Sequence, residues 1–203
     1  MSAYISDDYD EDFFPDFTSA DDDLRTVLTE FQNNGVQGEH TSAPNYGGFF
    51  GGDTFNGTSY GYTSTLVDGF AFLATGNLSY YFPPLNGSVG DGPVSHTLHG
   101  SITSITLGAG VSDTGVVDKP FLTFNFDTPL VGDIADGRTN VVHDVIWGLM
   151  NGSVSGASDS LNTVSNGGLL AALQANGLTL DGVSIADLVG ASALSETEVA
   201  LAA

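Results

Sequence analysis

Apolar residues recur with a helical period near both ends of the chain and alternate with polar residues through its middle. After Ser19, a candidate cap, the apolar spacing predicts a first helix that stops at Gly35. The apolar face of this helix consists of Leu24, Val27, Leu28 and Phe31. Residues 35–48 contain several Gly residues and a Pro and show no apolar period, so a loop is predicted there.

Residues 49–127 are rich in Thr, Ser, Val, Ile, Phe and Tyr, and Asn-Gly or Gly-Asn pairs interrupt them. β-branched and aromatic residues between such turn pairs are typical of antiparallel strands. The strands are predicted at 58–65, 69–82, 95–108 and 120–127.

The helical period returns after Arg138, where Asn140 is a candidate cap. Two further helices are predicted in the Ala- and Leu-rich segments 167–175 and 183–193. Strands followed by helices indicate an α+β fold. Because 203 residues with 41% apolar composition suffice for one core, residues 1–203 are expected to form a single domain.

Charge narrows the classes of function. The chain has 3 basic and 25 acidic residues, a formal net charge of -22. A strongly negative surface argues against nucleic-acid binding, which needs clustered Lys and Arg, and against docking on an anionic membrane. No segment reaches the length of a transmembrane helix, so membrane insertion is not expected. With zero Cys, a disulfide framework, a thiolate metal site and a Cys nucleophile are all excluded.

The N-terminal residues 1–18 form an acidic arm, and the pattern leaves open whether they pair as a short edge strand. The arm has neither a basic start nor a continuous apolar stretch, so it does not resemble an N-terminal signal peptide.

Two stretches in the strand region carry candidate ligand chemistry. Strand alternation sends Tyr80 and Tyr81 to opposite faces, so only one of them can point at a given ligand; both can equally be ordinary strand aromatics. His96 and His99 lie three residues apart, hence also on opposite faces, which makes a poor two-His metal site.

A third stretch lies on the predicted helix after Asn140. His143, Trp147 and Met150 fall at i, i+4 and i+7, on one helical face. An imidazole, an indole and a thioether on one face are suited to contact a flat aromatic ligand, and core packing is the alternative.

In this order, the three stretches resemble the HasA family of bacterial heme-acquisition hemophores. The family carries a Gly-Asn-Leu-Thr-Tyr-like strand, a His-Thr-Leu-aromatic-Gly strand and a Val-Val-His-x-Val-Val-Tyr-Gly-Leu-Met helix, similar to residues 76–80, 96–100 and 141–150 here. The resemblance covers roughly residues 31–150, with a poor match over 109–138. It implies a curved antiparallel sheet packed on one face by several α-helices, with the ligand held between loops at one edge.

The resemblance also implies the roles of individual residues. Tyr80 matches the ligand of ferric heme b, and His96 matches the His that hydrogen-bonds to that phenol. Where the family carries a second axial His, this chain has Val36, with His40 four residues later, which leaves that position to His40, to water or vacant. The expected heme-pocket residues are Tyr60, Phe82, Leu98, His143, Trp147 and Met150.

The tail resembles the family's short C-terminal export signal, at about residues 194–203. By this resemblance the protein is expected to be a secreted, monomeric, non-enzymatic carrier that takes heme, with hemoproteins as a source, and delivers it to an outer-membrane receptor. The alternative is an acidic secreted protein with a calcium-dependent structural or adhesive role, but no EF-hand loop or nonapeptide repeat is present. Nor is there a His-Glu-x-x-His or phosphate-loop motif typical of an enzyme.

Overall fold

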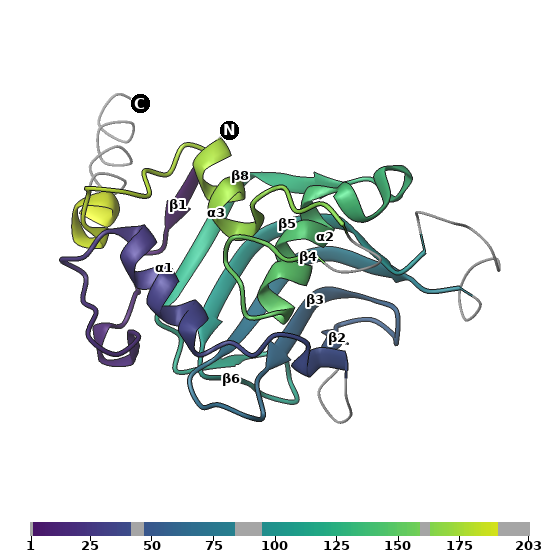
Figure 1. The fold of residues 1–203 in the computed structure, drawn as a ribbon, viewed down its shortest axis with the longest axis horizontal. Helices are drawn as coiled ribbons and strands as arrows, with labels where there is room; N and C mark the ends of the chain where they lie inside the picture. Colours follow the sequence, from purple (N-terminus) through teal and green to yellow (C-terminus); the bar gives the residue numbers. More distant parts are fainter. Residues whose placement is uncertain (1, 42–46, 84–94, 159–162, 191–203) are drawn as a thin grey trace, which may run out of the picture.

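The alternating middle of the chain forms one six-stranded antiparallel sheet in the order β1-β8-β5-β4-β3-β2 (Figure 1). This computed structural model describes residues 2–41, 47–83, 95–158 and 163–190. The strands of the sheet are β1 Ala3–Ile5, β2 Gly48–Phe50, β3 Asn56–Thr63, β4 Ala71–Tyr81, β5 Thr97–Gly108 and β8 Leu122–Gly132. A separate two-stranded hairpin consists of β6 Gly110–Val111 and β7 Val117–Asp118.

The four predicted strands correspond to β3, β4, β5 and β8. The acidic arm does contribute an edge strand, because β1 pairs with β8. Strand β8 runs past its predicted end at residue 127 and contains Pro129. The β5–β8 register shifts between Ile102 and Ser104, and the ladder is interrupted there. Pro129 lies in this interruption, where its missing N–H costs no ladder hydrogen bond. Strands β2, β6 and β7 were not predicted, because two or three residues are too few to show alternation.

The helices lie on one face of the sheet, as expected (Figure 1). They are α1 Leu24–Asn33, α2 Val141–Met150 and α3 Gly168–Ala175, and residues 185–190 are also helical. Helix α2 contacts β5, β8 and α3, so it is the central element of the helical layer. The core between helices and sheet includes the fully buried side chains of Phe31, Phe70, Phe72, Leu78, Ile102, Phe124, Val145 and Leu149.

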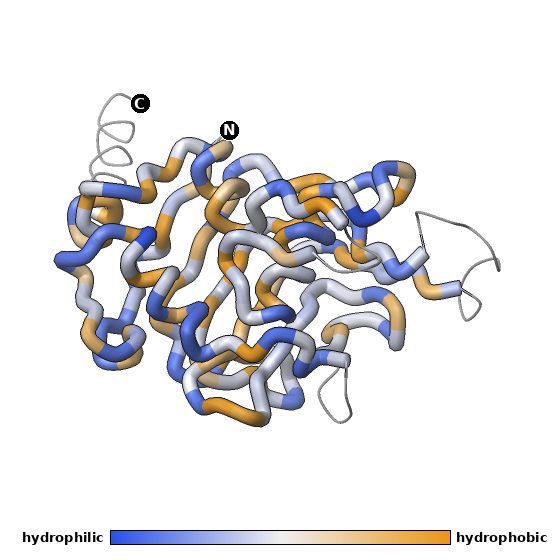
Figure 2. Tube along the Cα trace, viewed as in Figure 1, coloured by the Kyte–Doolittle hydropathy of each residue, from blue (hydrophilic) through white to orange (hydrophobic). Residues whose placement is uncertain are grey.

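Helix α1 begins later than predicted. Asp23, not Ser19, is its N-cap, and the Asp23 side chain accepts a hydrogen bond from the Thr26 amide. Ser19 instead donates its amide to the Asp22 carboxylate at 2.8 Å, which makes a turn ahead of the helix. The predicted apolar face is buried, and Figure 2 shows hydrophobic and hydrophilic residues interleaved along this helix, as one-sided burial requires.

Gly35 allows the chain leaving α1 to touch the chain leaving α2. A Cβ atom on Gly35 would lie 2.2 Å from the Cα of Gly152, so only glycine fits at this crossing. The contact brings the segment after α1 beside the C-terminal end of α2. That segment contains the short 3-10 helix η2, Glu39–Thr41.

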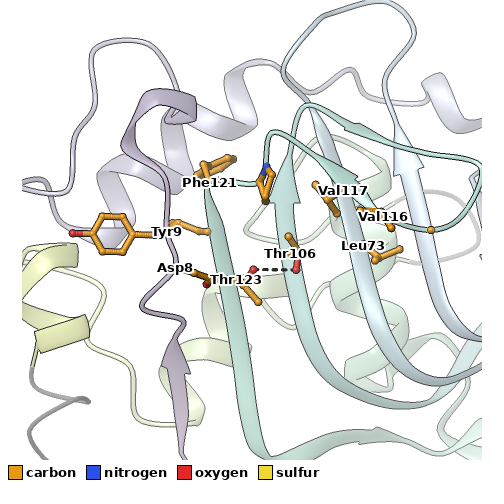
Figure 3. Close-up of a pocket in the computed structure, with 11 residues that line it drawn as sticks. Asp8, Tyr9, Leu73, Thr106, Val116, Val117, Phe121 and Thr123 are labelled. Atoms are coloured by element: carbon orange, nitrogen blue, oxygen red, sulfur yellow. Dashed lines mark hydrogen bonds between the residues drawn. The ribbon is translucent and has the colours of Figure 1, made fainter.

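The opposite face of the sheet is more polar. Thr106 and Thr123 are register partners, and their hydroxyl oxygens lie 3.1 Å apart above a shallow cavity of about 280 Å³ (Figure 3). Asp8 and Tyr9 of the N-terminal arm border this cavity. Over the described ranges, no helix has the length and hydropathy needed to cross a membrane.

Candidate functional site

A cavity of about 720 Å³ lies at the end of the sheet where β4 stops and β5 starts. Its walls come from η2, strands β2 to β5 and helix α2, and it has the size and apolar character of a small-molecule site. The structure brings all nine residues singled out in the sequence to this one cavity: His40, Tyr60, Tyr80, Phe82, His96, Leu98, His143, Trp147 and Met150.

Tyr80 and His96 form a hydrogen-bonded pair in the cavity wall, with the Tyr80 hydroxyl 2.9 Å from His96 Nδ1. Tyr80 lies near the end of β4 and is paired in register with Leu98 of β5. His96 directly precedes β5 and has a left-handed backbone, with φ at 58°. A regular strand from residue 95 was predicted, but this conformation starts the strand at Thr97 instead.

The protonation states of this pair follow from burial and from a nearby cation. Burial raises the pKa of Tyr80, and the positive charge of Arg138 opposes that rise. The Tyr80 phenol is therefore neutral at pH 7 and has a proton that it can donate to His96. Burial, aided by Arg138, lowers the pKa of His96, so the imidazole stays neutral and accepts through Nδ1.

A second tyrosine in the cavity, Tyr60, contacts a thioether. Its hydroxyl donates to Met150 Sδ at 3.5 Å, and burial raises its pKa far above the ordinary value. A thioether is a weak acceptor and not a base, so Met150 does not offer Tyr60 what the imidazole of His96 offers Tyr80. Of the tyrosines that line the cavity, Tyr80 is the better source of an anionic oxygen.

Aromatic rings form one flat wall beside Tyr80. The Tyr80 and Phe82 rings stack with centroids 5.7 Å apart and an interplanar angle of 16°. Phe82 also contacts the His96 ring edge-on at 4.6 Å. Such a wall suits contact with a large planar ligand.

Helix α2 forms another part of the cavity wall, and its predicted cap is confirmed: the Asn140 side chain accepts from the His143 amide. His143 Nδ1 accepts the Leu98 amide hydrogen at 3.1 Å, so its ring proton is on Nε2. The His143 and Trp147 rings stack with an interplanar angle of 13°. The predicted face of His143, Trp147 and Met150 thus lines the cavity, and Met150 also packs in the hydrophobic core.

His40 lines the same cavity and is 6% exposed. Its Nδ1 lies 3.2 Å from the Met150 carbonyl oxygen, and because a carbonyl can only accept, Nδ1 carries the proton. Nε2 then carries the lone pair, which is the tautomer of a metal-binding histidine whose other nitrogen donates to a backbone carbonyl. The ring also packs edge-on against Trp147 at 4.8 Å.

The neighbouring residue, Glu39, fixes η2 in position. Its buried carboxylate accepts hydrogen bonds from the Ser64 hydroxyl at 2.7 Å, the Thr65 amide at 2.6 Å and the Thr65 hydroxyl at 2.9 Å. These bonds tie η2 to the connection between β3 and β4. His40 is therefore held between this attachment and the end of α2.

Seven residues of the cavity wall were not predicted as site residues, among them Phe49, Phe55 and Arg138. Phe49 packs edge-on against Tyr60 at 5.0 Å, and Phe55 lies 6.4 Å from Phe82. The chain has 13 phenylalanines, and no sequence pattern distinguishes these two from the others. Arg138 had a usable signal, because it is one of only three basic residues.

Comparison with known proteins agrees with the fold. The hemophore HasA of Serratia marcescens is 35% identical over 135 residues, which are 64% of this chain and 66% of that protein, just under two thirds of its length. The holo hemophore HasA of Yersinia pestis has the same fold, with a TM-score of 0.65 and 24% identity over 92% of this chain and 96% of its own.

A monomeric HasA mutant of Yersinia pseudotuberculosis is similar in fold, with a TM-score of 0.63 and 23% identity over 90% of this chain and 93% of that chain. The sequence profile of the family described as heme-binding protein A (HasA) matches residues 2–203, almost the whole chain. The chain therefore belongs to the heme-binding protein A (HasA) family.

Proposed function

We propose that this protein is an extracellular hemophore, which captures ferric heme b through Tyr80. The observation that carries the proposal is the Tyr80–His96 pair in the wall of an apolar cavity of about 720 Å³. The named relatives, the HasA hemophores of Serratia and Yersinia, support the same ligand.

The pair supplies the chemistry that ferric iron requires. A phenol ionises near pH 10 in water, so it serves as an anionic ligand near neutral pH only if its proton has an acceptor. His96 is that acceptor, at 2.9 Å. A hard anionic oxygen stabilises ferric over ferrous iron, and Tyr is an established axial ligand of heme. The preference for ferric heme follows from this donor.

On the other side of the iron we propose His40 as the second axial ligand. Its Nδ1–H donates to Met150, which leaves Nε2 as the nitrogen with a lone pair. The porphyrin would contact the six other predicted pocket residues, Tyr60, Phe82, Leu98, His143, Trp147 and Met150. Their rings and aliphatic groups would exclude water from the iron.

Heme is the cargo of this protein, and no reaction is assigned to it. We propose that the protein takes heme from hemoproteins and releases it to an outer-membrane receptor, as a monomer of one domain over residues 1–203. The proposed C-terminal export signal at residues 194–203 lies outside the described residues. The calcium-dependent alternative has no support in the described part of the chain, where no group of three or more acidic, His or Cys side chains could hold a metal ion.

Titration of the purified protein with ferric heme tests the proposal. We expect one heme per chain, with a Soret band and a low-spin component that disappears in His40→Ala. His99→Ala is the matched control, because His99 does not line the cavity, and it should retain the wild-type spectrum. Failure of the wild type to bind one heme contradicts the hemophore assignment. Full retention of the low-spin component in His40→Ala contradicts the role of His40 alone.

A further inference from the structure

The described wall of the cavity carries one residue with a permanent positive charge, Arg138, and no Asp or Glu. This distribution is unexpected for a chain with 25 acidic and three basic residues. The other two cations lie elsewhere: Arg25 pairs with Asp181 on the exposed surface, and Lys119 is exposed in the turn between β7 and β8. A guanidinium in the wall of an apolar cavity is suited to a ligand that carries an anionic group.

We propose that Arg138 binds a carboxylate of the porphyrin and so selects the diacid ligand. The inference rests on the proposed function, because it concerns the same cavity and the same cargo. Arg presents parallel N–H donors that match the two oxygens of a carboxylate, which a single ammonium cannot do.

Overall charge gives a physical reason for such an anchor. The chain has a formal net charge of -22, so its field repels an anionic ligand. Local interactions are much stronger than distant ones inside a partly dehydrated cavity. One guanidinium near the binding position can therefore offset a repulsion that arises from many distant carboxylates.

The backbone on both sides of Arg138 is fixed by side-chain hydrogen bonds. Arg138 lies in η4, Ile134–Thr139, the 3-10 segment that connects β8 to α2. Asn140 Nδ2 donates to the Gly137 carbonyl at 2.6 Å and to the Leu98 carbonyl at 3.0 Å. Asn166 Nδ2 donates to the Thr139 carbonyl at 2.8 Å. The segment is thus held against β5 at Leu98, which is two residues after His96 in the sequence. A backbone fixed in this way is typical of a segment that carries a binding residue.

The charge of Arg138 reaches the iron-binding end of the cavity. It lowers the pKa of His96 and opposes the burial-driven rise in the pKa of Tyr80. Arg138 could therefore act on the Tyr80 oxygen instead of on the ligand. The two roles differ in one respect: only carboxylate binding depends on the acid groups of the porphyrin.

A comparison of two porphyrins separates these roles. Wild type, Arg138→Gln, Arg138→Lys and Lys119→Gln are titrated with ferric protoporphyrin IX and with its dimethyl ester in the same buffer. Arg138→Gln should bind the diacid at least about tenfold more weakly and the diester with wild-type affinity. Arg138→Lys should recover part of the loss, and Lys119→Gln, which removes the same charge outside the cavity, should match wild type with both ligands.

Equal weakening of both porphyrins by Arg138→Gln overturns the inference, and so does unchanged binding of the diacid. If Arg138→Gln does not fold, the wild type still decides: it should prefer the diacid by about tenfold, and the preference should shrink as salt is added. Absence of that preference overturns the inference. If the wild type binds neither porphyrin, the proposed function itself fails, which is a distinguishable result.

Discussion

The positions of Tyr80 and His96 relative to each other make Tyr80 suited to bind iron. Tyr80 is placed by its register opposite Leu98, and His96 reaches it from a left-handed turn residue outside the strand. Strand alternation predicted only that Tyr80 and Tyr81 point to opposite faces, and the family resemblance indicated Tyr80 as the ligand. It could not predict the left-handed conformation of His96, because that depends on the connection between β4 and β5 and not on the strand pattern.

The pKa of His96 predicts a pH dependence of heme retention. A histidine in water is half protonated near pH 6.5. Because burial and Arg138 lower the pKa of His96, the folded protein keeps this imidazole neutral at that pH, and it becomes protonated only under more acidic conditions. Protonated His96 cannot accept the Tyr80 proton. Heme should therefore be retained through the ordinary titration range of histidine and released below it.

The Soret band followed across an acid titration measures this release. His96→Ala should lose this release step and bind heme more weakly at neutral pH, whereas His99→Ala should release heme as wild type does. The same release midpoint in wild type and in His96→Ala would exclude His96 as the group responsible.

Gly47 and Gly48 give a second test at the level of single residues. Gly47 has a φ of 67°, and a Cβ atom on it would lie 2.3 Å from the Tyr60 hydroxyl, whereas a Cβ on Gly48 meets nothing within 4 Å. Gly47→Ala should displace Tyr60 and lower the free energy of unfolding by about 1–3 kcal/mol, with weaker heme binding. Gly48→Ala should change both far less. Urea unfolding and heme titration of the two variants check this, and equal effects would refute it.

At the level of elements, long patterned segments were predicted well and short ones were not. The strands β3 to β5 and the helix after Asn140 follow their sequence period closely. The segment that carries η2 was predicted only as a loop, because its position depends on bonds from Glu39 to Ser64 and Thr65, about 25 residues away. No local pattern contains that information.

The attachment of η2 predicts an effect on His40 without a change in His40 itself. In Glu39→Gln the amide nitrogen cannot accept hydrogen bonds, so at least one bond to Ser64 or Thr65 is lost. η2 should loosen, and the low-spin fraction of the ferric heme complex should fall while Tyr80 still binds iron. Glu30→Gln, a change of the same type at a half-buried position of α1, is the matched control. An unaltered low-spin fraction in Glu39→Gln would contradict this role.

At the level of the whole molecule, the site is assembled from elements between residues 40 and 150 that meet at one end of the sheet. The order of the motifs was sufficient to predict which of their residues share a site. The contribution of Arg138 could not be predicted in this way, because it lies in an irregular connection with no period to follow.

The acidic surface predicts a salt dependence of stability. With a formal net charge of -22 and few cations to pair, repulsion between carboxylates opposes the compact state. At physiological ionic strength, added sodium chloride screens this repulsion between carboxylates that lie more than about 8–10 Å apart. The free energy of unfolding in urea should therefore rise from low to physiological salt. A decrease would mean that attractive ion pairs such as Arg25–Asp181 dominate the electrostatics.

Ferric heme titration of Tyr80→Phe beside Tyr81→Phe is the most direct test of the account. Phenylalanine retains the ring that stacks on Phe82 and removes only the oxygen, and Tyr81 is the neighbouring tyrosine on the other face of β4. Tyr80→Phe should lose the phenolate-to-iron charge-transfer band and bind heme at least about tenfold more weakly, and Tyr81→Phe should match wild type. Wild-type spectrum and affinity in Tyr80→Phe would contradict the central claim that Tyr80 ligates the iron.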